Sequence, residues 1–398
     1  MKKLSMVLAL ILAGAMLFGM AGCNDILNKD TTTTAAKPAA GTQKIAKGDI
    51  KIGVLYITGA EETSGYTYAH HKGILEMIST LGLNKDSQLI IKDKIDDTDV
   101  TKTNAALQEM IDAGCNIIFA NSFNYMNSMK EFADNPKNAH IVFSHCSGFL
   151  SNPSNFNNYF GRIYEARFLS GLAAGKKAKQ LFDADPANGK KLGYVAAMDS
   201  TNSEVTGGIN AFALGVQTVF PEAEIKVKVT GSWFDPTGEA NAAKALIQEG
   251  CNVIAQHCDT DGPQVEAQNA KVFGCGYNSD MTAAAPDAHL TAPIWNWGVY
   301  YTATVEQVIN GSWKSVNYFE GMNKSLIGLS PINEKIAAPG TKEIVDEYQK
   351  KIEKGEFFVF AGPIVDNTGK EIIKAGEKLT DAQITGEINY YVKGVSLS

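Results

Sequence analysis

The chain repeats part of itself, and this repeat constrains the fold more than any other feature. Residues 106–120 read ALQEMIDAGCNIIFA, and residues 245–255 read ALIQEGCNVIA. In both copies a stripe of Ala, Leu and Ile at helical spacing stops at a glycine, Gly114 or Gly250, and an apolar run rich in β-branched residues follows. A glycine at this place is typical of the left-handed residue that ends a helix. Each copy therefore predicts the end of a helix and the start of a strand.

The segments around the two copies follow the same order. A short apolar strand opens each unit; a helix, a second strand, the repeated helix and strand, and a further strand come after it. We expect these elements at 52–56, 68–81, 88–92, 106–120 and 140–144 in the first unit, and at 192–196, 207–219, 224–230, 245–255 and 271–274 in the second. Strands that alternate with helices form right-handed βαβ units, so each unit should hold a parallel sheet.

Two similar α/β units predict two Rossmann-like lobes around a hinged ligand cleft, which is the type I periplasmic-binding-protein fold. About 350 residues follow position 49, more than one hydrophobic core usually supports. We expect an N-terminal lobe at 50–160, a second lobe at 161–290, and a crossover with a C-terminal extension that completes both lobes at 291–398. Chain crossings are expected near Asn155–Gly161 and Pro286–Pro293, and a hairpin beyond Phe357 around the turn Asp366–Gly369.

The N-terminus predicts export. Lys2 and Lys3 precede an apolar run, residues 4–20, that ends in Ala-Gly-Cys23. This pattern is typical of a secretory signal peptide, here residues 1–22, and it resembles the lipobox of bacterial lipoproteins, in which Cys23 is lipidated. Residues 23–49, rich in Thr, Ala and Lys, predict a flexible tether. We therefore expect an extracytoplasmic protein that is lipid-anchored to the cell membrane. This location favours a binding protein over a tandem of enzyme domains.

Charge and cysteine content exclude several classes of partner. A net charge of -7 and a pI near 5.5 argue against binding to nucleic acid or to an anionic membrane surface. We therefore expect contact with the membrane through the lipid anchor only. The cysteines other than Cys23 form no CxxC pair and no disulfide framework, although a single bridge stays open. No metal and no cofactor is required. We expect a monomer that binds a small molecule.

Ligands of parallel α/β sheets bind beyond the carboxyl ends of the strands. This rule selects residues 61–67, 121–125 and 144–147 of the first unit, residues 199–204, 232–235, 257–261 and 277–280 of the second, and the crossing near Trp295. Aromatic rings in these loops would sandwich a flat ring, while amides and carboxylates would fix its hydrogen-bonding edge. Any one of these rings can equally fill the core behind a loop. The candidate ligand-binding residues are Tyr66, Thr67, Tyr68, Asn121, Ser122, Phe123, Trp233, Asp235, His257, Asn278, Asp280, Trp295 and Trp297.

The amino-acid sequence resembles the basic membrane protein (BMP) family, whose members are substrate-binding lipoproteins of ABC transporters and include purine nucleoside receptors. The resemblance runs from about Lys51 to the C-terminus. It is carried by the segments 66–73, 121–126, 159–171, 231–236 and 295–301, which read YTYAHHKG, NSFNYM, YFGRIYEARFLSG, GSWFDP and WNWGVYY. It implies an ABC importer that receives a purine nucleobase or nucleoside from this chain and passes it to the permease.

The resemblance also implies roles for single residues. Trp233 takes the place of the stacking ring of the second lobe, Tyr66 takes the aromatic position of the first, and Asp280 matches the last acid of the Gly-Val-Asp-Ser-Asp loop. The chain departs from the family where Tyr277-Asn278 replaces Val-Asp, and where Trp295-Asn-Trp297 replaces a lysine. Ribose recognition is therefore open, and a nucleobase, a nucleoside, riboflavin or a sugar all stay possible.

An enzyme and a sensor are the alternative functions. The sequence has no Gly-x-Ser-x-Gly elbow, no HExxH and no Walker loop, which disfavours catalysis. His70 and His71 are adjacent, so on a helix they point about 100° apart and cannot hold one metal. A sensor that presents its ligand to a membrane receptor would have the same sequence features as a transport protein.

Overall fold

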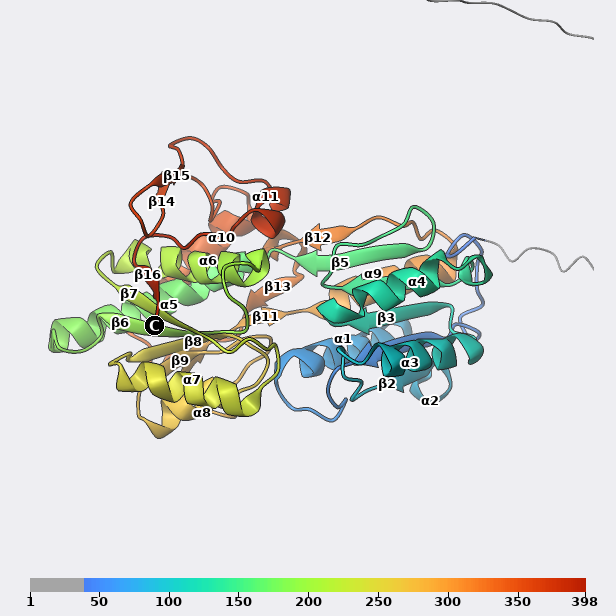
Figure 1. The fold of residues 1–398 in the computed structure, drawn as a ribbon, viewed down its shortest axis with the longest axis horizontal. Coiled ribbons are helices and arrows are strands. Elements are labelled where there is room, and N and C mark those ends of the chain that lie inside the picture. Colours follow the sequence, from blue (N-terminus) through green and yellow to red (C-terminus); the bar gives the residue numbers. More distant parts are fainter. Residues whose placement is uncertain (1–38) are drawn as a thin grey trace, which may run out of the picture. The chain divides into compact units, whose positions relative to one another are not determined.

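The structure is a computed structural model that describes residues 39–398 (Figure 1). The predicted signal peptide, Cys23 and the first part of the predicted tether lie outside the described residues. The described chain contains two six-stranded sheets, each parallel throughout, with helices packed against them. Two parallel-sheet lobes confirm the predicted fold class.

The first lobe is built mainly from residues 52–161. Its sheet has the strand order β12-β5-β4-β3-β1-β2. The elements are β1 (Ile52–Tyr56), α1 (Gly65–Leu81), α2 (Lys85–Gln88), β2 (Leu89–Lys92), α3 (Val100–Asp112), β3 (Ile117–Asn121), the 3₁₀ turn η1 (Phe123–Tyr125), α4 (Met126–Asp134), the 3₁₀ turn η2 (Pro136–Asn138), β4 (Val142–Cys146) and β5 (Phe156–Gly161).

The second lobe follows and has the strand order β10-β9-β8-β6-β7-β16. Its elements are α5 (Tyr164–Ala184), β6 (Lys191–Ala196), α6 (Ser203–Val219), β7 (Glu224–Val229), α7 (Pro236–Gln248), β8 (Val253–His257), α8 (Gly262–Asn269), β9 (Phe273–Cys275) and β10 (His289–Thr291). The remaining elements are β11 (Pro293–Trp295), α9 (Trp297–Asn310), β12 (Tyr318–Glu320), the 3₁₀ turn η3 (Met322–Lys324), β13 (Ile327–Leu329), α10 (Thr341–Glu353), β14 (Ile364–Val365), β15 (Glu371–Ile373), α11 (Asp381–Gly386) and β16 (Val395–Leu397).

The internal repeat produces equivalent strand pairings in the two sheets. Ile52 of β1 pairs with Ile117 of β3, and Leu192 of β6 pairs with Val253 of β8. The glycines that end the repeated helices have the predicted left-handed conformation, with φ of 82° at Gly114 and 90° at Gly250. The repeat therefore fixes the centre of each sheet.

The chain passes between the lobes at three places. It leaves the first sheet after β5, returns through β11 and α9 to β12, and leaves again through β13 to α10. β11 and β13 pair with each other as an antiparallel ribbon, which lies between the two sheets in Figure 1. These connections are the segments about which the lobes can hinge.

The chain crosses between the lobes directly after Gly161, at the end of the predicted crossing Asn155–Gly161. Most of that stretch is not a connection, however, because Phe156–Gly161 is strand β5 of the first sheet. Its polar residues are tolerated inside the fold because their side-chain N–H groups have partners. Asn157 Nδ2 donates to Tyr300 Oη at 3.0 Å, and Asn158 Nδ2 donates to the Leu150 carbonyl at 2.6 Å.

The end of the predicted tether was also placed too late. Ala40 is buried, and its N–H donates to the Ala139 carbonyl. Ile45 N–H donates to the Ile309 carbonyl, and Gly41 packs beneath Trp313. Residues 40–49 therefore belong to the packed body, because the first lobe offers backbone partners that composition does not reveal.

The C-terminal segment, residues 357–398, adds a small layer to the second lobe. β14 and β15 pair antiparallel, which confirms the predicted hairpin around Asp366–Gly369. β16 joins the edge of the second sheet beside β7, and α11 packs on α6. Within residues 39–398, no helix is long and apolar enough to cross a membrane.

Candidate functional site

A small cavity lies between the lobes where the strands of both sheets end. We call it the ring cavity. Every wall residue follows a strand or begins the next helix, so the cavity lies where the strand-end rule expects a ligand. The free space is about 30 Å³, enough for water but not for an organic ring, because one water needs roughly 10–15 Å³ of such space. It is lined by Ile57, Tyr66, Ser122, Phe123, Ser147, Glu204, Trp233, Asp259 and Tyr277.

Aromatic rings face the ring cavity from both lobes. Tyr66 and Phe123 come from the first lobe, and Trp233 and Tyr277 from the second. Tyr66 is held edge-on against His70, with ring centroids 4.4 Å apart. Four rings around one space form a set of apolar faces between which a flat molecule can be enclosed.

Tyr277 is fixed from behind by two basic side chains. The guanidinium carbon of Arg167 lies 3.9 Å from the centre of the tyrosine ring, and the His257 ring meets it edge-on at 4.8 Å. Arg167 is 2% exposed and donates to Tyr194 Oη and to the Gln256 carbonyl. Burial and the charge of Arg167 hold the pKa of His257 well below its usual range, so His257 is neutral.

Two carboxyl groups of the second lobe reach the ring cavity. Burial raises the pKa of Glu204 to about 7, against the opposing charge of Arg167 and a hydrogen bond from Ser147. Burial also raises the pKa of Asp259 well above its usual range, with Glu239 adding to the shift and Asn278 opposing it. Asn278 Nδ2 donates to Asp259 Oδ1 at 3.1 Å. The cavity thus offers two carboxyl groups that are costly to ionise while no partner is bound.

The lobes touch directly at the edge of this site. Gly65 N–H donates to Ser279 Oγ at 3.1 Å, and Ser64 Oγ donates to Asp261 Oδ2 at 3.2 Å. Gly65 has a φ of 84°, and a Cβ at this position would lie 2.2 Å from the Asp259 carbonyl oxygen. Only glycine permits this close approach, so the structure corresponds to a closed arrangement of the two lobes.

The structure brings some of the predicted site residues together and separates others. Tyr66, Ser122, Phe123 and Trp233 line the ring cavity, and Thr67 lines an adjoining hollow with Asp259. His257 and Asn278 stand behind the cavity as partners of its walls. Asn121 is buried nearby and accepts a hydrogen bond from Tyr159.

Five predicted residues lie away from the ring cavity. Tyr68 lies on α1, and Asp235 caps α7 by accepting from Gly238 N–H. Asp280 is exposed and accepts hydrogen bonds from Thr282. Trp295 and Trp297 stack on each other at 4.3 Å in the core near the crossings, and Trp297 stacks on His70.

Sequence reasoning missed five wall residues: Ile57, Ser147, Glu204, Asp259 and Tyr277. Four of them lie in loops that the strand-end rule had selected, and Ile57 directly follows β1. What was missing was a way to rank residues within a loop. In the sequence, Glu204 and Asp259 do not differ from ordinary surface acids. Only the packing of the second lobe shows that they are buried.

Comparison with known proteins identifies the family. The model of the Bmp family, described as "ABC transporter substrate-binding protein PnrA-like", matches residues 50–356. The chain belongs to this family. Members are solute-binding proteins of ABC transporters and work outside the cytoplasm, with a small molecule and a permease as partners. The PnrA-like match ends before the C-terminal segment.

Relatives of this PnrA-like chain include a purine-binding protein of Brucella abortus, 34% identical over 350 residues, which cover 88% of this chain and 94% of the relative. A protein of Haloferax volcanii named as an ABC transporter glucose-binding protein is 34% identical over 257 residues, covering 65% of this chain and 62% of the relative. A solute-binding protein structure from Aeropyrum pernix superimposes with a TM-score of 0.65 at 18% identity, over 79% of this chain and 94% of the other. This last likeness concerns the fold alone.

Proposed function

We propose that this chain binds a purine nucleobase or nucleoside in the ring cavity and delivers it to the permease of an ABC importer. The observation that carries the proposal is the pairing of aromatic walls from both lobes with the buried carboxyl groups Glu204 and Asp259. A purine has a flat face for the rings and N–H donors for the carboxyl oxygens. The purine-binding relative from Brucella abortus supports this choice of ligand.

Binding and delivery follow from closure of the lobes. The ring cavity is too small for a purine as it stands, so the lobes must separate to admit one and wall side chains must move aside to enclose it. A ligand that contacts both lobes stabilises the closed form relative to the open one. The permease would then recognise closure. The same cycle would serve a sensor, which differs only in the partner that reads the closed form.

The site is suited to binding rather than to catalysis. Cys146 is the thiol nearest to Tyr66, and burial raises its pKa well above the usual range, so it is a poor nucleophile. Among residues 39–398 no group of His, Cys, Asp and Glu is placed to hold a metal ion. We propose that the ligand is bound and released unchanged, as is typical of the solute-binding proteins of this family.

A sugar is the second candidate ligand. It is favoured by the relative from Haloferax volcanii that is named as glucose-binding, because aromatic faces and carboxyl groups also suit a sugar ring. The proposal extends to the anchor: Cys23 would carry the lipid, residues 1–22 would be removed, and the protein would act as a monomer at the outer side of the cell membrane.

A thermal-shift titration tests the ligand. Adenine, guanine, hypoxanthine, their nucleosides, glucose and riboflavin are added singly to the purified protein at a concentration far above the expected Kd. At about 100 times Kd a ligand stabilises the fold by about 2.7 kcal/mol, which raises Tm by several degrees. A shift with glucose alone would favour the second candidate, and a panel without any purine shift would overturn the purine proposal.

A further inference from the structure

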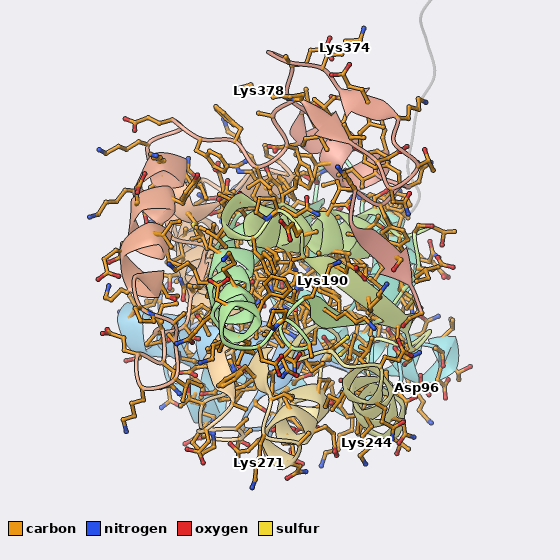
Figure 2. All side chains as sticks on the ribbon, turned by 90° about the vertical axis from the view of Figure 1, so that its left-hand side faces the viewer. Asp96, Lys190, Lys244, Lys271, Lys374 and Lys378 are labelled. Atoms are coloured by element: carbon orange, nitrogen blue, oxygen red, sulfur yellow. The ribbon has the colours of Figure 1, made fainter. Side chains whose placement is uncertain are left out.

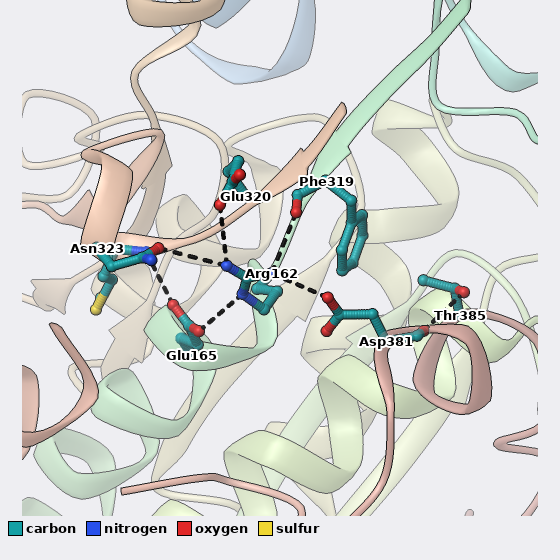
Figure 3. Close-up of polar contacts among 8 residues, drawn as sticks. Arg162, Glu165, Phe319, Glu320, Asn323, Asp381 and Thr385 are labelled. Atoms are coloured by element: carbon teal, nitrogen blue, oxygen red, sulfur yellow. Dashed lines mark hydrogen bonds and ion pairs between the residues drawn. The ribbon is translucent and has the colours of Figure 1, made fainter. Parts of the chain in front are cut away.

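Arg162 lies in the first connection between the lobes, between β5 and α5. Its backbone N–H donates to the Glu320 carbonyl at 2.8 Å. Its side chain reaches the same strand (Figure 3), because Nη1 donates to the Phe319 carbonyl at 3.1 Å and Nη2 to Glu320 Oε2 at 3.2 Å. Phe319 and Glu320 belong to β12, the edge strand of the first sheet. The guanidinium of Arg162 is therefore held on the first lobe.

Asp381 belongs instead to a layer of the second lobe. It is the first residue of α11 in the C-terminal segment. This segment is fastened to the second lobe, because β16 pairs with β7, α11 packs on α6, and the side-chain amide of Asn210 in α6 bonds to two of its backbone groups. The far edge of the segment, at Lys374 and Lys378, stands at the outside of the molecule in Figure 2. Asp381 should therefore move with the second lobe.

One nitrogen atom of Arg162 joins the two lobes. Nη1 donates to Asp381 Oδ2 at 2.9 Å and also to the Phe319 carbonyl at 3.1 Å. A hydrogen bond is lost at a donor–acceptor distance of about 3.6 Å, so both contacts persist only while the lobes keep nearly this arrangement. Glu320 helps to keep the guanidinium on the first lobe, whereas the Asp381 side chain is 48% exposed. The contact that opening breaks is therefore the ion pair of Arg162 with Asp381.

This ion pair stands where the lobes are otherwise apart. A hollow with a free volume of about 750 Å³ has walls from β5 and β12 of the first lobe, from the start of α6 in the second, and from α11. Phe319 and Asp381 both line this hollow. At the edge near Gly65 the lobes touch directly, but on the side of α11 open space lies between them. The ion pair thus bridges a gap between the lobes.

We propose that the C-terminal segment is a latch, in which Asp381 binds Arg162 when the lobes are closed and releases it when they open. Both are then positioning residues, which set ligand affinity without touching the ligand, because affinity includes the free energy of closure. The latch acts with or without a ligand, since neither residue is a wall of the ring cavity. Its effect on binding rests on the proposed function, whereas its effect on the shape of the ligand-free protein does not.

Asp381→Lys tests the latch, because it places a like charge beside Arg162. The matched control is Glu387→Lys, which makes the same change of charge at the other end of α11, where Glu387 is exposed and lies outside the hollow. Asp381→Asn removes the charge without adding a new one. Small-angle scattering of the ligand-free proteins measures their extension, and calorimetry measures affinity for the ligand selected by the thermal-shift panel.

The ligand-free Asp381→Lys protein should have a larger radius of gyration than the unsubstituted protein and than Glu387→Lys. Asp381→Lys should bind the ligand about tenfold more weakly, because attraction becomes repulsion. Asp381→Asn should bind it roughly two- to fivefold more weakly, as the loss of a half-exposed ion pair implies. In the Arg162→Gln protein, Asp381→Asn should change affinity no further, since the pair is already lost.

Equal scattering of ligand-free Asp381→Lys and Glu387→Lys would overturn the latch. Equal affinities of these two variants would also overturn it. A loss of affinity in Asp381→Asn that persists in the Arg162→Gln protein would do the same, because Asp381 would then act without Arg162. If no ligand of the panel binds, the proposed function fails, and the scattering of the ligand-free variants still decides whether the latch exists.

Discussion

At the scale of single residues, burial of Glu204 links the proposed ligand site to protein stability. Its carboxyl pKa rises from the ordinary value of 4.5 to about 7. The folded protein therefore binds more protons than the unfolded chain between these pH values, and stability decreases as pH rises through this window. Protonation of the Glu204 carboxyl group, or a hydrogen bond that a ligand donates to it, should therefore stabilise the folded protein.

Glu204→Gln should remove part of this pH dependence. Between pH 5 and pH 8, the free energy of unfolding of the unsubstituted protein should fall by on the order of 2 kcal/mol more than that of the variant, because the amide has no charge to bury. Urea unfolding at the two pH values measures this difference. Glu62→Gln, at an exposed acid of the first lobe, is the control and should keep the original slope. A Glu204→Gln variant with an unchanged slope would contradict this account of the carboxyl group.

Trp233→Leu tests the aromatic wall. Stacking of a base on an aromatic ring is worth about 1–3 kcal/mol, so the variant should bind its ligand roughly 5- to 150-fold more weakly. Calorimetry with the ligand selected by the thermal-shift panel gives the ratio. Phe234→Leu, at a neighbouring ring that is 42% exposed and outside the ring cavity, should change affinity little. Similar losses in both variants would argue against Trp233 as a stacking platform.

The sequence predicts the residues that line the ring cavity only as far as their loops. Tyr66, Ser122, Phe123 and Trp233 were predicted and do line the ring cavity. Trp295 and Trp297 were predicted by the same rule, yet their rings stack in the core. The direction of a side chain depends on packing between segments far apart in the sequence, and one sequence alone does not contain that information.

At the scale of helices and strands, local patterns predict what local chemistry fixes. The repeat, its glycine caps and the alternation of strand and helix predict a parallel sheet in each lobe, whereas the pairing of β1 with β3 and of β6 with β8 is seen only in the structure. Strand β5 was not predicted, because three closely spaced asparagines, Asn155, Asn157 and Asn158, are typical of a loop. Their amide partners, among them Tyr300 and Leu150, come from other segments. Tertiary hydrogen bonds therefore override the local pattern there.

Arg162→Gln should loosen the elements that Arg162 joins. The guanidinium is 17% exposed and faces Glu165, Glu320 and Asp381, so its loss leaves three acids without their cation. Breaking a fully buried pair costs about 3–5 kcal/mol, and we expect roughly 2 kcal/mol here because the cluster is only partly buried. Asp381→Asn removes an acid that is 48% exposed and should cost less than about 1 kcal/mol. Urea unfolding compares the two, and equal costs would contradict a central role for Arg162.

At the scale of the whole molecule, two lobes joined by three chain connections should move mainly by opening and closing of the cleft between them. The closed contact depends on backbone atoms at its edge, where Gly65 N–H donates to Ser279 Oγ. The ring cavity has room only for water in this closed arrangement, so a bound ring must displace wall side chains as the lobes close around it. The measured ligand affinity must therefore include the free energy of closing the lobes. A substitution can then change affinity without changing the stability of either lobe.

Gly65→Ala should obstruct closure without unfolding the protein. The added Cβ would lie 2.2 Å from the Asp259 carbonyl oxygen, so the lobes cannot approach as closely as they do here. Gly114→Ala is the matched control, because Gly114 has a similar φ of 82° and no atom within 4 Å of a Cβ. Both variants should lose about 1 kcal/mol of stability from backbone strain, but only Gly65→Ala should weaken ligand binding, by tenfold or more in calorimetry. Small-angle scattering should show that ligand compacts the Gly114→Ala protein and fails to compact the Gly65→Ala protein. If Gly65→Ala binds and compacts as the control does, the close contact at Gly65 is not what limits closure, and the ligand would have to be held by the walls of the ring cavity alone.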